Sequence, residues 1–535
     1  MENQTQNLKD LTSELQNRLG KPVSPQVVEA AIESLGIRPK DTPVDYGYPS
    51  IEALASDIYQ KLRSLDNQEP LRNCREREGQ ERESISVSDY TVVKMKLFSQ
   101  YYTLGVLHLL PVFIQIAAII LFGYSLWTYT GFNEIQSTAV VLGVIVGMVS
   151  TGGFVQVIGK QASFYWNYKD YTMVQQTISY LFKLGMKTLF SVLLGIFLLN
   201  FFFHIYPYEV LLIVFCYAFF VGLLLLILAP LHPVKQRWMI TVSILAGTIA
   251  ALLLKNNTHY PIYITHWFGI TITILVTQVF LFFFFKKIQK KGLNAHSAPL
   301  KTPVVLYHNY SHFLYGMMLY AFIFIDRILA WSSGIQENPP FLVFFEKNYE
   351  LGMDLAILVF LLLAGVLEFS IATFTRFIDI GQKHTASDQI ANYALEMQRN
   401  YRLHVMALWI TGILAFVFIF YLLQAPWALK NHFKPEMIKQ CLTIFIVGGI
   451  GYIFFAWGIL NALYLFTLGQ IIKPLKAIIY AALVNFSVGF VLSRFVAYDY
   501  SVFGMLVGSI VFMMLTCRAL HSFFKQLDYH YYAAF

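Results

Sequence analysis

Four ionisable residues interrupt two long apolar segments of this sequence. Asp326 and Arg327 lie in LYGMMLYAFIFIDRILAW (314–331), and Asp354 and Glu368 lie in LGMDLAILVFLLLAGVLEFSIAT (351–373). A charged side chain at the centre of a bilayer costs roughly 2.5–3.5 kcal/mol on insertion scales, so it usually faces protein or a water-filled cavity. These residues are therefore the first candidates for a functional site.

Asp326 and Arg327 are adjacent in the sequence, so in a helix their side chains point about 100° apart and each needs a further partner. We expect an outer ring in which Asp354 and Arg494 complete the set. The ring has two interpretations, a fixed ion-pair clamp between helices or the lining of a translocation path. Arg327 is also placed to stack on Trp331 one turn later, and Arg494 to reach the outer headgroups.

Glu368 lies deeper in its segment, with no basic residue within one helical turn. We expect it either to be protonated by its apolar surroundings or to meet a cation from another span, such as Lys187 or Arg376. A relay in a cavity and a buried structural partner are equally compatible with the sequence. Lys183 and Lys187, one turn apart, would suit an anionic ligand or serve as positively charged anchors at the inner face.

A polar side chain also occurs in the first apolar segment, where Gln115 follows Pro111. Proline inside a membrane helix bends it, and broken helices in transporters often border the substrate path. Gln115 is therefore a further path candidate, while the nearby His108 is more typical of a hydrogen-bonded structural residue.

The composition predicts an all-helical polytopic membrane protein. Of 535 residues, 57% are hydrophobic and 13% are charged, against about 25% charged in soluble proteins. Apolar runs long enough to cross a core of roughly 30 Å recur through the chain. We expect twelve spans: 104–129, 139–159, 184–206, 210–230, 238–254, 263–285, 314–331, 351–373, 404–423, 441–467, 476–497 and 502–522.

These spans fall into two groups of six, which predicts two transmembrane lobes at 89–285 and 314–522 joined by a basic linker, 286–313. Lys and Arg in the short loops concentrate on one side, so the positive-inside rule predicts that both termini, including the tail 523–535, are cytoplasmic. The lysines between the ninth and tenth spans, Lys430, Lys434 and Lys439, run against this bias.

Residues 1–88 differ in composition from the rest and predict a small cytoplasmic helical module. Apolar spacing and capping signals indicate helices at 8–19, 25–35 and 51–65, followed by a charged linker, 67–83. The module contains no catalytic motif, so we expect it to serve as a docking domain.

Several function classes lack their residues in this chain. There is no Walker A loop, GxSxG or HExxH, and no Cys or His spacing that indicates a metal, so we expect no cofactor. The outside loops are too short and too poor in carboxylates for a typical lipid-linked glycosyltransferase. The net charge of +8 is spread over loops, so we expect a lipid bilayer and no nucleic acid as partner.

Two groups of six spans, a basic central linker and short loops resemble the multidrug/oligosaccharidyl-lipid/polysaccharide (MOP) exporter superfamily. Within it, YAFIFIDRILAWSSG (320–334) is similar to the seventh-span region of the inner-membrane exporter of the Pel exopolysaccharide pathway, matched by Asp326, Arg327 and Trp331. Two features depart from the resemblance: the N-terminal module is extra, and the first span lacks the Asp of many drug exporters.

The resemblance implies a flippase-like transporter of the cell inner membrane, with two lobes around a central cleft, that moves an exopolysaccharide or lipid-linked glycan outward. A cytoplasmic glycosyltransferase docked through residues 1–88 is a further implied partner. Two alternatives remain: a membrane-embedded glycosyl- or acyltransferase, and a non-catalytic membrane subunit of a polysaccharide synthase complex.

Overall fold

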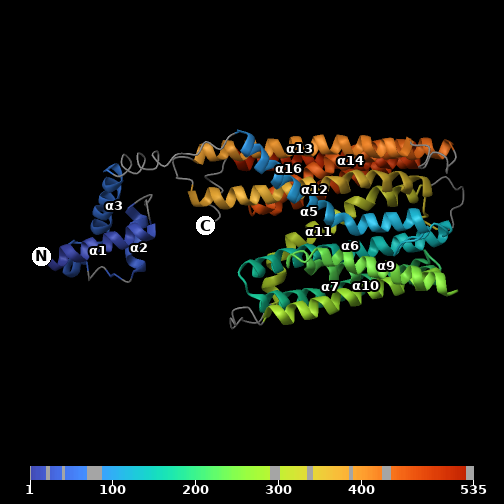
Figure 1. The fold of residues 1–535 in the computed structure, drawn as a ribbon, viewed down its shortest axis with the longest axis horizontal. Helices are drawn as coiled ribbons and strands as arrows, with labels where there is room; N and C mark the ends of the chain where they lie inside the picture. Colours follow the sequence, from blue (N-terminus) through green and yellow to red (C-terminus); the bar gives the residue numbers. More distant parts are fainter. Residues whose placement is uncertain are drawn as a thin grey trace. The chain divides into compact units, whose positions relative to one another are not determined.

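The computed structural model describes residues 2–19, 25–35, 37–38, 42–68, 87–289, 302–333, 341–384, 390–424 and 435–525. The chain divides into two compact units, Met1–Met95 and Lys96–Phe535 (Figure 1). The expected linker 67–83 falls mostly outside the described residues.

Among its described residues before α5, the first unit forms the α-helices α1 (Glu2–Leu19), α2 (Pro25–Ser34) and α3 (Ile51–Gln68), with a π-helical turn at Thr42–Tyr46. The three helices predicted from the apolar spacing are thus confirmed. Their apolar stripes meet in one small core of Leu11, Leu15, Val28, Ile32, Leu54, Ala55, Ile58 and Leu62, because each amphipathic helix can bury its stripe only against the others.

The second unit consists of long helices that lie side by side in Figure 1. The first group is α5 (Val87–Phe122), α6 (Glu134–Asn167), α7 (Tyr171–Phe203), α8 (Tyr208–Leu228), α9 (Trp238–Asn257) and α10 (Ile262–Gln289). The second group is α11 (Thr302–Trp331), α12 (Lys347–His384), α13 (Ile390–Gln424), α14 (Pro435–Thr467), α15 (Ile472–Phe495) and α16 (Val502–Lys525).

Eleven helices of the described residues are long and apolar enough to cross a membrane. The expected span 104–129 lies on α5. That helix ends at Phe122, and Gly123 follows with a positive φ of 63°. The expected boundary at Tyr129 is therefore wrong, because the chain turns into a loop closed by a bridge between Tyr124 and Tyr129.

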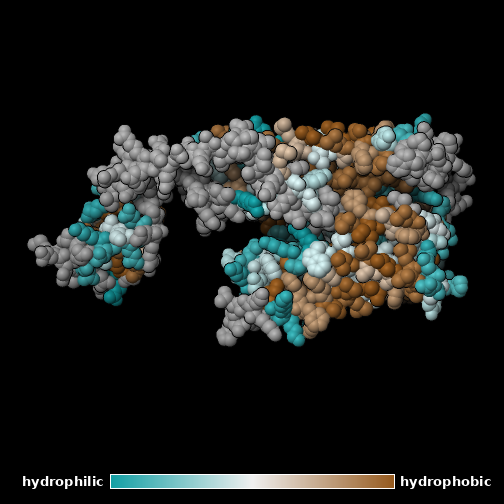
Figure 2. Space-filling view, in the orientation of Figure 1, coloured by the Kyte–Doolittle hydropathy of each residue, from teal (hydrophilic) through white to brown (hydrophobic). Residues whose placement is uncertain are grey.

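Most of these helices extend beyond the apolar segments that predicted them. The 34 residues of α6 span about 51 Å, whereas the hydrocarbon core is about 30 Å thick. Figure 2 shows a broad hydrophobic band over the helices of the second unit, with hydrophilic residues at its two ends. Since α10 continues to Gln289 and α11 begins at Thr302, both ends of the expected linker 286–313 are helical.

Helix pairs that pack extensively belong mostly to the same group. In the first group, α6 packs on α7 and α8, and α9 packs on α10; in the second, α12 packs on α14, and α16 packs on α14 and α15. One extensive contact between the groups joins α6 and α11. It depends on small residues, since a Cβ at Gly152 would meet the Tyr320 ring and one at Gly153 would meet Phe313.

Candidate functional site

Asp326 and Arg327 lie near the end of α11 and are both buried, at 0% and 4% exposure. The Tyr349 hydroxyl donates a hydrogen bond to Asp326 Oδ2 at 2.7 Å, and Ser501 Oγ donates to the Asp326 carbonyl at 3.0 Å. As expected for adjacent helical residues, Asp326 finds a partner on another helix.

Arg327 faces two carboxylates on α12. Its Nη1 donates to Glu350 Oε1 and, at 3.0 Å, to Asp354 Oδ1. Glu350 and Asp354 are four residues apart and so lie on one face of the helix. The Glu350 side chain is 10% exposed and that of Asp354 is 60% exposed, so Arg327 connects a buried acid to an accessible one.

Three carboxylates, those of Asp326, Glu350 and Asp354, thus surround one guanidinium. Asp326 Oδ1, Glu350 Oε2 and Arg327 Nε have no hydrogen-bond partner among the described residues. The Tyr452 hydroxyl of α14 lies beside the same charges. Buried acids in excess of their cation are stable only when they take up a proton or bind a further cationic or hydroxyl group. We call these residues the α11–α12 acid cluster.

Three residues of the expected ring, Asp326, Arg327 and Asp354, do lie together. The fourth member is Glu350 and not Arg494. Arg494 is exposed, and its Nη2 donates to Ser332 Oγ at 2.8 Å while the guanidinium lies 5.3 Å from the Phe490 ring centroid. Arg494 thus connects α15 to the end of α11. Hydropathy placed the start of the eighth span at Leu351; because α12 begins at Lys347, Glu350 is part of the helix.

The expected stacking partner of Arg327 is also corrected. The guanidinium carbon lies 5.8 Å from the centroid of Phe324, three residues before it. The Trp331 ring instead packs against Phe345, with centroids 5.4 Å apart. Phe324 and Trp331 each lie about one helical turn from Arg327, so either ring could stack on it. Trp331 is not available because it packs on Phe345 from the loop after α11.

Glu368 pairs with a residue that the sequence did not indicate. Arg237 Nη1 lies 2.5 Å from Glu368 Oε1, with the two side chains 36% and 31% exposed. The partners expected from the sequence lie elsewhere: Lys187 is exposed on α7, and the Arg376 guanidinium lies over the Tyr101 ring at 5.1 Å. Nothing local in the sequence relates Arg237 to a residue 131 positions away.

The Gln115 side chain is buried and forms two hydrogen bonds. Its Nε2 donates to Thr248 Oγ1 of α9 at 2.8 Å, and its Oε1 accepts from the Leu126 amide at 2.8 Å. Gln115 belongs to α5, the helix that contains Pro111. Its two bonds fix the loop after α5 against α9. The side chain of His108 lies outside the described residues. These bonds satisfy the amide and favour a structural role for Gln115.

A second polar cluster lies in and beside the loop after α5. The Tyr124 hydroxyl donates to Thr265 Oγ1 at 2.9 Å, and Lys255 Nζ lies 4.9 Å from the Tyr124 ring centroid. Burial raises the pKa of Tyr124 to about 12, although its bond to Thr265 acts in the opposite direction. Tyr124 is therefore neutral at physiological pH. Within the described ranges, no group of three His, Cys, Asp or Glu residues could hold a metal ion.

No protein-family model and no curated protein matches this sequence. Solved structures, however, match over most of its length. An outward-facing multidrug resistance MATE family transporter of the MOP superfamily aligns at a TM-score of 0.57 and 8% identity, covering 81% of this chain and 97% of that chain. The chain has the MATE transporter fold.

Two further structures give the same result. MATE in the bent conformation aligns at a TM-score of 0.54 and 12% identity over 81% of this chain and 96% of that chain. A MOP superfamily transporter from Pyrococcus furiosus, described as having a binding pocket of reverse polarity, aligns at 0.58 and 10% identity over 81% and 97%. The superfamily resemblance is thus confirmed at the level of the fold, and the narrower Pel-type resemblance stays a prediction.

Proposed function

We propose that this protein is an inner-membrane transporter that exports an exopolysaccharide or a lipid-linked glycan, with both termini in the cytoplasm. The observation that carries the proposal is the α11–α12 acid cluster inside a MATE fold. A cluster of buried ionisable groups within membrane-spanning helices marks a substrate or ion pathway more often than a structural feature. In the proposed arrangement the two helix groups form two lobes, and the cluster lies toward the outer side.

Two features support a glycan substrate: the first span has no carboxylate, and the acid cluster contains both hydrogen-bond donors and acceptors. The apolar segment 104–122 of α5 contains no carboxylate, so the first span lacks the acid expected of a drug/cation antiporter. The acid cluster instead combines carboxylates, a guanidinium and the hydroxyls of Tyr349 and Tyr452. Such mixed donors and acceptors match the hydroxyl groups of a sugar chain.

The structural neighbours are transporters by their descriptions, and we take this protein as a transporter rather than an enzyme. The first unit, with its own apolar core, is a suitable docking module for a cytoplasmic glycosyltransferase. That partner, like the glycan, is part of the proposal.

The test measures surface and intracellular polysaccharide separately in cells that carry Asp326→Ala with Arg327→Ala, at equal membrane levels of protein. Export predicts that surface polymer falls while polymer or precursor accumulates inside. Lys347→Gln, an exposed charge on the first turn of α12, is the matched control and should change neither pool. If both pools fall together, the protein acts in synthesis; if neither changes, the cluster is a structural clamp.

A further inference from the structure

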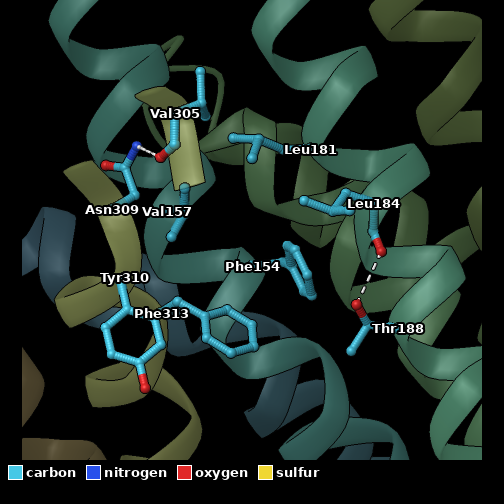
Figure 3. A pocket seen from close by; sticks show the side chains of 9 residues that line it. All are labelled: Phe154, Val157, Leu181, Leu184, Thr188, Val305, Asn309, Tyr310 and Phe313. Atoms are coloured by element: carbon cyan, nitrogen blue, oxygen red, sulfur yellow. Dashed lines mark hydrogen bonds between the residues drawn. The ribbon is translucent and has the colours of Figure 1, made fainter. Parts of the chain in front are cut away.

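A cavity of about 420 Å³ lies among α6, α7 and α11, away from the acid cluster. Figure 3 shows the side chains that line it: Phe154, Val157, Leu181, Leu184, Thr188, Val305, Asn309, Tyr310 and Phe313. Its volume falls within the range of about 300–1,000 Å³ that is usual for small-molecule sites. We call it the α6–α7–α11 groove.

The walls of the groove are almost entirely apolar. Of its polar side chains, Thr188 donates to the Leu184 carbonyl at 3.1 Å and Asn309 Nδ2 donates to the Val305 carbonyl at 2.8 Å, so both donors are used within their own helices (Figure 3). Most of helix α7 is not covered by protein: only 17% of its most apolar stretch is buried. A groove of this kind on a membrane helix is complementary to a hydrocarbon chain.

A contact between a lysine and a histidine lies one turn from the groove. Lys160 Nζ lies 3.3 Å from His312 Nδ1, joining α6 to α11. Lys160 is three residues from Val157 and His312 is three residues from Asn309, both of which line the groove. No carboxylate in the described part of the chain forms an ion pair with Lys160. Since an ammonium has three donors, Lys160 can bind an anion while it contacts His312.

The direction of the helices places the Lys160–His312 contact beside the groove, between Val305 near the start of α11 and Phe154 deeper along α6. The helices α6 and α11 run antiparallel, because Gly152 contacts Tyr320 whereas Lys160 contacts His312. Lys160 lies about 10 Å from the end of α6 at Asn167, which on the proposed orientation is near the inner headgroups. Phe154 and Leu184 lie deeper along their helices, at the level of acyl chains.

We propose that the α6–α7–α11 groove binds one acyl chain of an anionic phospholipid, whose phosphate is held by Lys160 and His312. The bound lipid would contact α6 and α11, a pair of helices that joins the two groups. The proposal does not depend on which substrate is transported.

Native mass spectrometry of the purified full-length protein in detergent tests this site. The protein is titrated with phosphatidylglycerol and with phosphatidylcholine that carry identical acyl chains, and the apparent Kd of the first bound lipid is compared. We expect tighter binding of phosphatidylglycerol. Equal binding of the two lipids would overturn the proposal, because the groove would then take any chain without regard to the headgroup.

Two variants locate the binding within the molecule. Lys160→Gln should weaken phosphatidylglycerol about fivefold, the usual effect of one basic residue on an anionic lipid, and leave phosphatidylcholine unchanged. Leu184→Trp should fill the groove and weaken both lipids. The controls are Lys183→Gln and Leu194→Trp on exposed positions of α7. If the controls act as strongly as the test variants, the attraction is a diffuse surface effect and the assigned site is wrong. The comparison of phosphatidylglycerol with phosphatidylcholine uses only the wild-type protein, so it tests the proposal even if a variant fails to fold.

Discussion

Arg237 and Glu368 lie 131 positions apart, yet their side chains form an ion pair at 2.5 Å. Arg237 immediately precedes α9 in the first group of helices, and Glu368 belongs to α12 in the second. The pair is partly exposed, so its contribution to stability is small, about 0.2–1 kcal/mol. Its position suggests a different consequence, since any separation of the two groups on this side has to break it.

Exchange of the two charges tests this relationship. We expect Glu368→Arg to impair export by placing two cations together, and Arg237→Glu combined with Glu368→Arg to restore it, because the attraction is rebuilt. Export is followed as surface polysaccharide at equal protein levels. Arg376→Glu, on the same helix but bound to the Tyr101 ring, should not restore the Glu368→Arg variant. Equal activity of the single and double variants would show that the pair has no role in transport.

Removal of the guanidinium from the acid cluster should be more costly than removal of an exposed acid. Arg327→Met leaves Glu350 buried beside Asp326 without a cation, and breaking a buried pair in this way costs about 3–5 kcal/mol. Asp354→Asn affects a side chain that is 60% exposed and should cost less than about 1 kcal/mol. Thermal unfolding of the purified protein in detergent compares the two Tm values.

The combination Arg327→Met with Glu350→Gln provides the control for this prediction. Because the second change removes the uncompensated charge, it should recover much of the lost stability. A double variant that is as unstable as Arg327→Met alone would show that packing of the arginine stem, rather than charge, determines the loss.

Hydropathy and helical spacing predicted most of the elements, because a bilayer and a small helical core each impose a simple pattern on the sequence. The acid cluster was predicted in part, through Asp326, Arg327 and Asp354. Glu350 was missed because hydropathy locates the apolar centre of a helix but not the polar turn that begins it. The pairing of Arg237 with Glu368 depends on which helices become neighbours, and no local pattern encodes that.

Gln115 gives a test of structural against path-lining roles. Gln115→Leu removes both of its 2.8 Å bonds and leaves the buried Leu126 amide without a partner, at a cost of about 1–3 kcal/mol. Hydrogen exchange of residues 123–131 should accelerate. Ser191→Ala, whose hydroxyl bonds only the Lys187 carbonyl of its own helix, should leave that loop unchanged. Loss of export with normal loop protection would instead place Gln115 on the translocation path.

A pH dependence is expected in the first unit, where Asp57 accepts bonds from Tyr48 and from Lys61, the latter at 2.6 Å. Burial alone would raise the pKa of Asp57, but Lys61 and Tyr48 outweigh it, and the net effect lowers the pKa below its ordinary value of 3.8. A carboxyl whose pKa is lowered by folding stabilises the folded state above its unfolded pKa and loses that contribution as the pH falls through the folded value.

Asp57→Asn should therefore weaken the hydrogen-exchange protection of α3 at pH 7, by less than about 1 kcal/mol because the pair is partly exposed. The difference from the wild type should shrink as the pH falls below about 4, where the wild-type carboxyl also becomes neutral. Glu33→Gln, an exposed acid on α2, is the matched control and should show no such convergence. A difference that persists unchanged to the lowest pH would mean that Asp57 acts through its hydrogen-bond geometry rather than its charge.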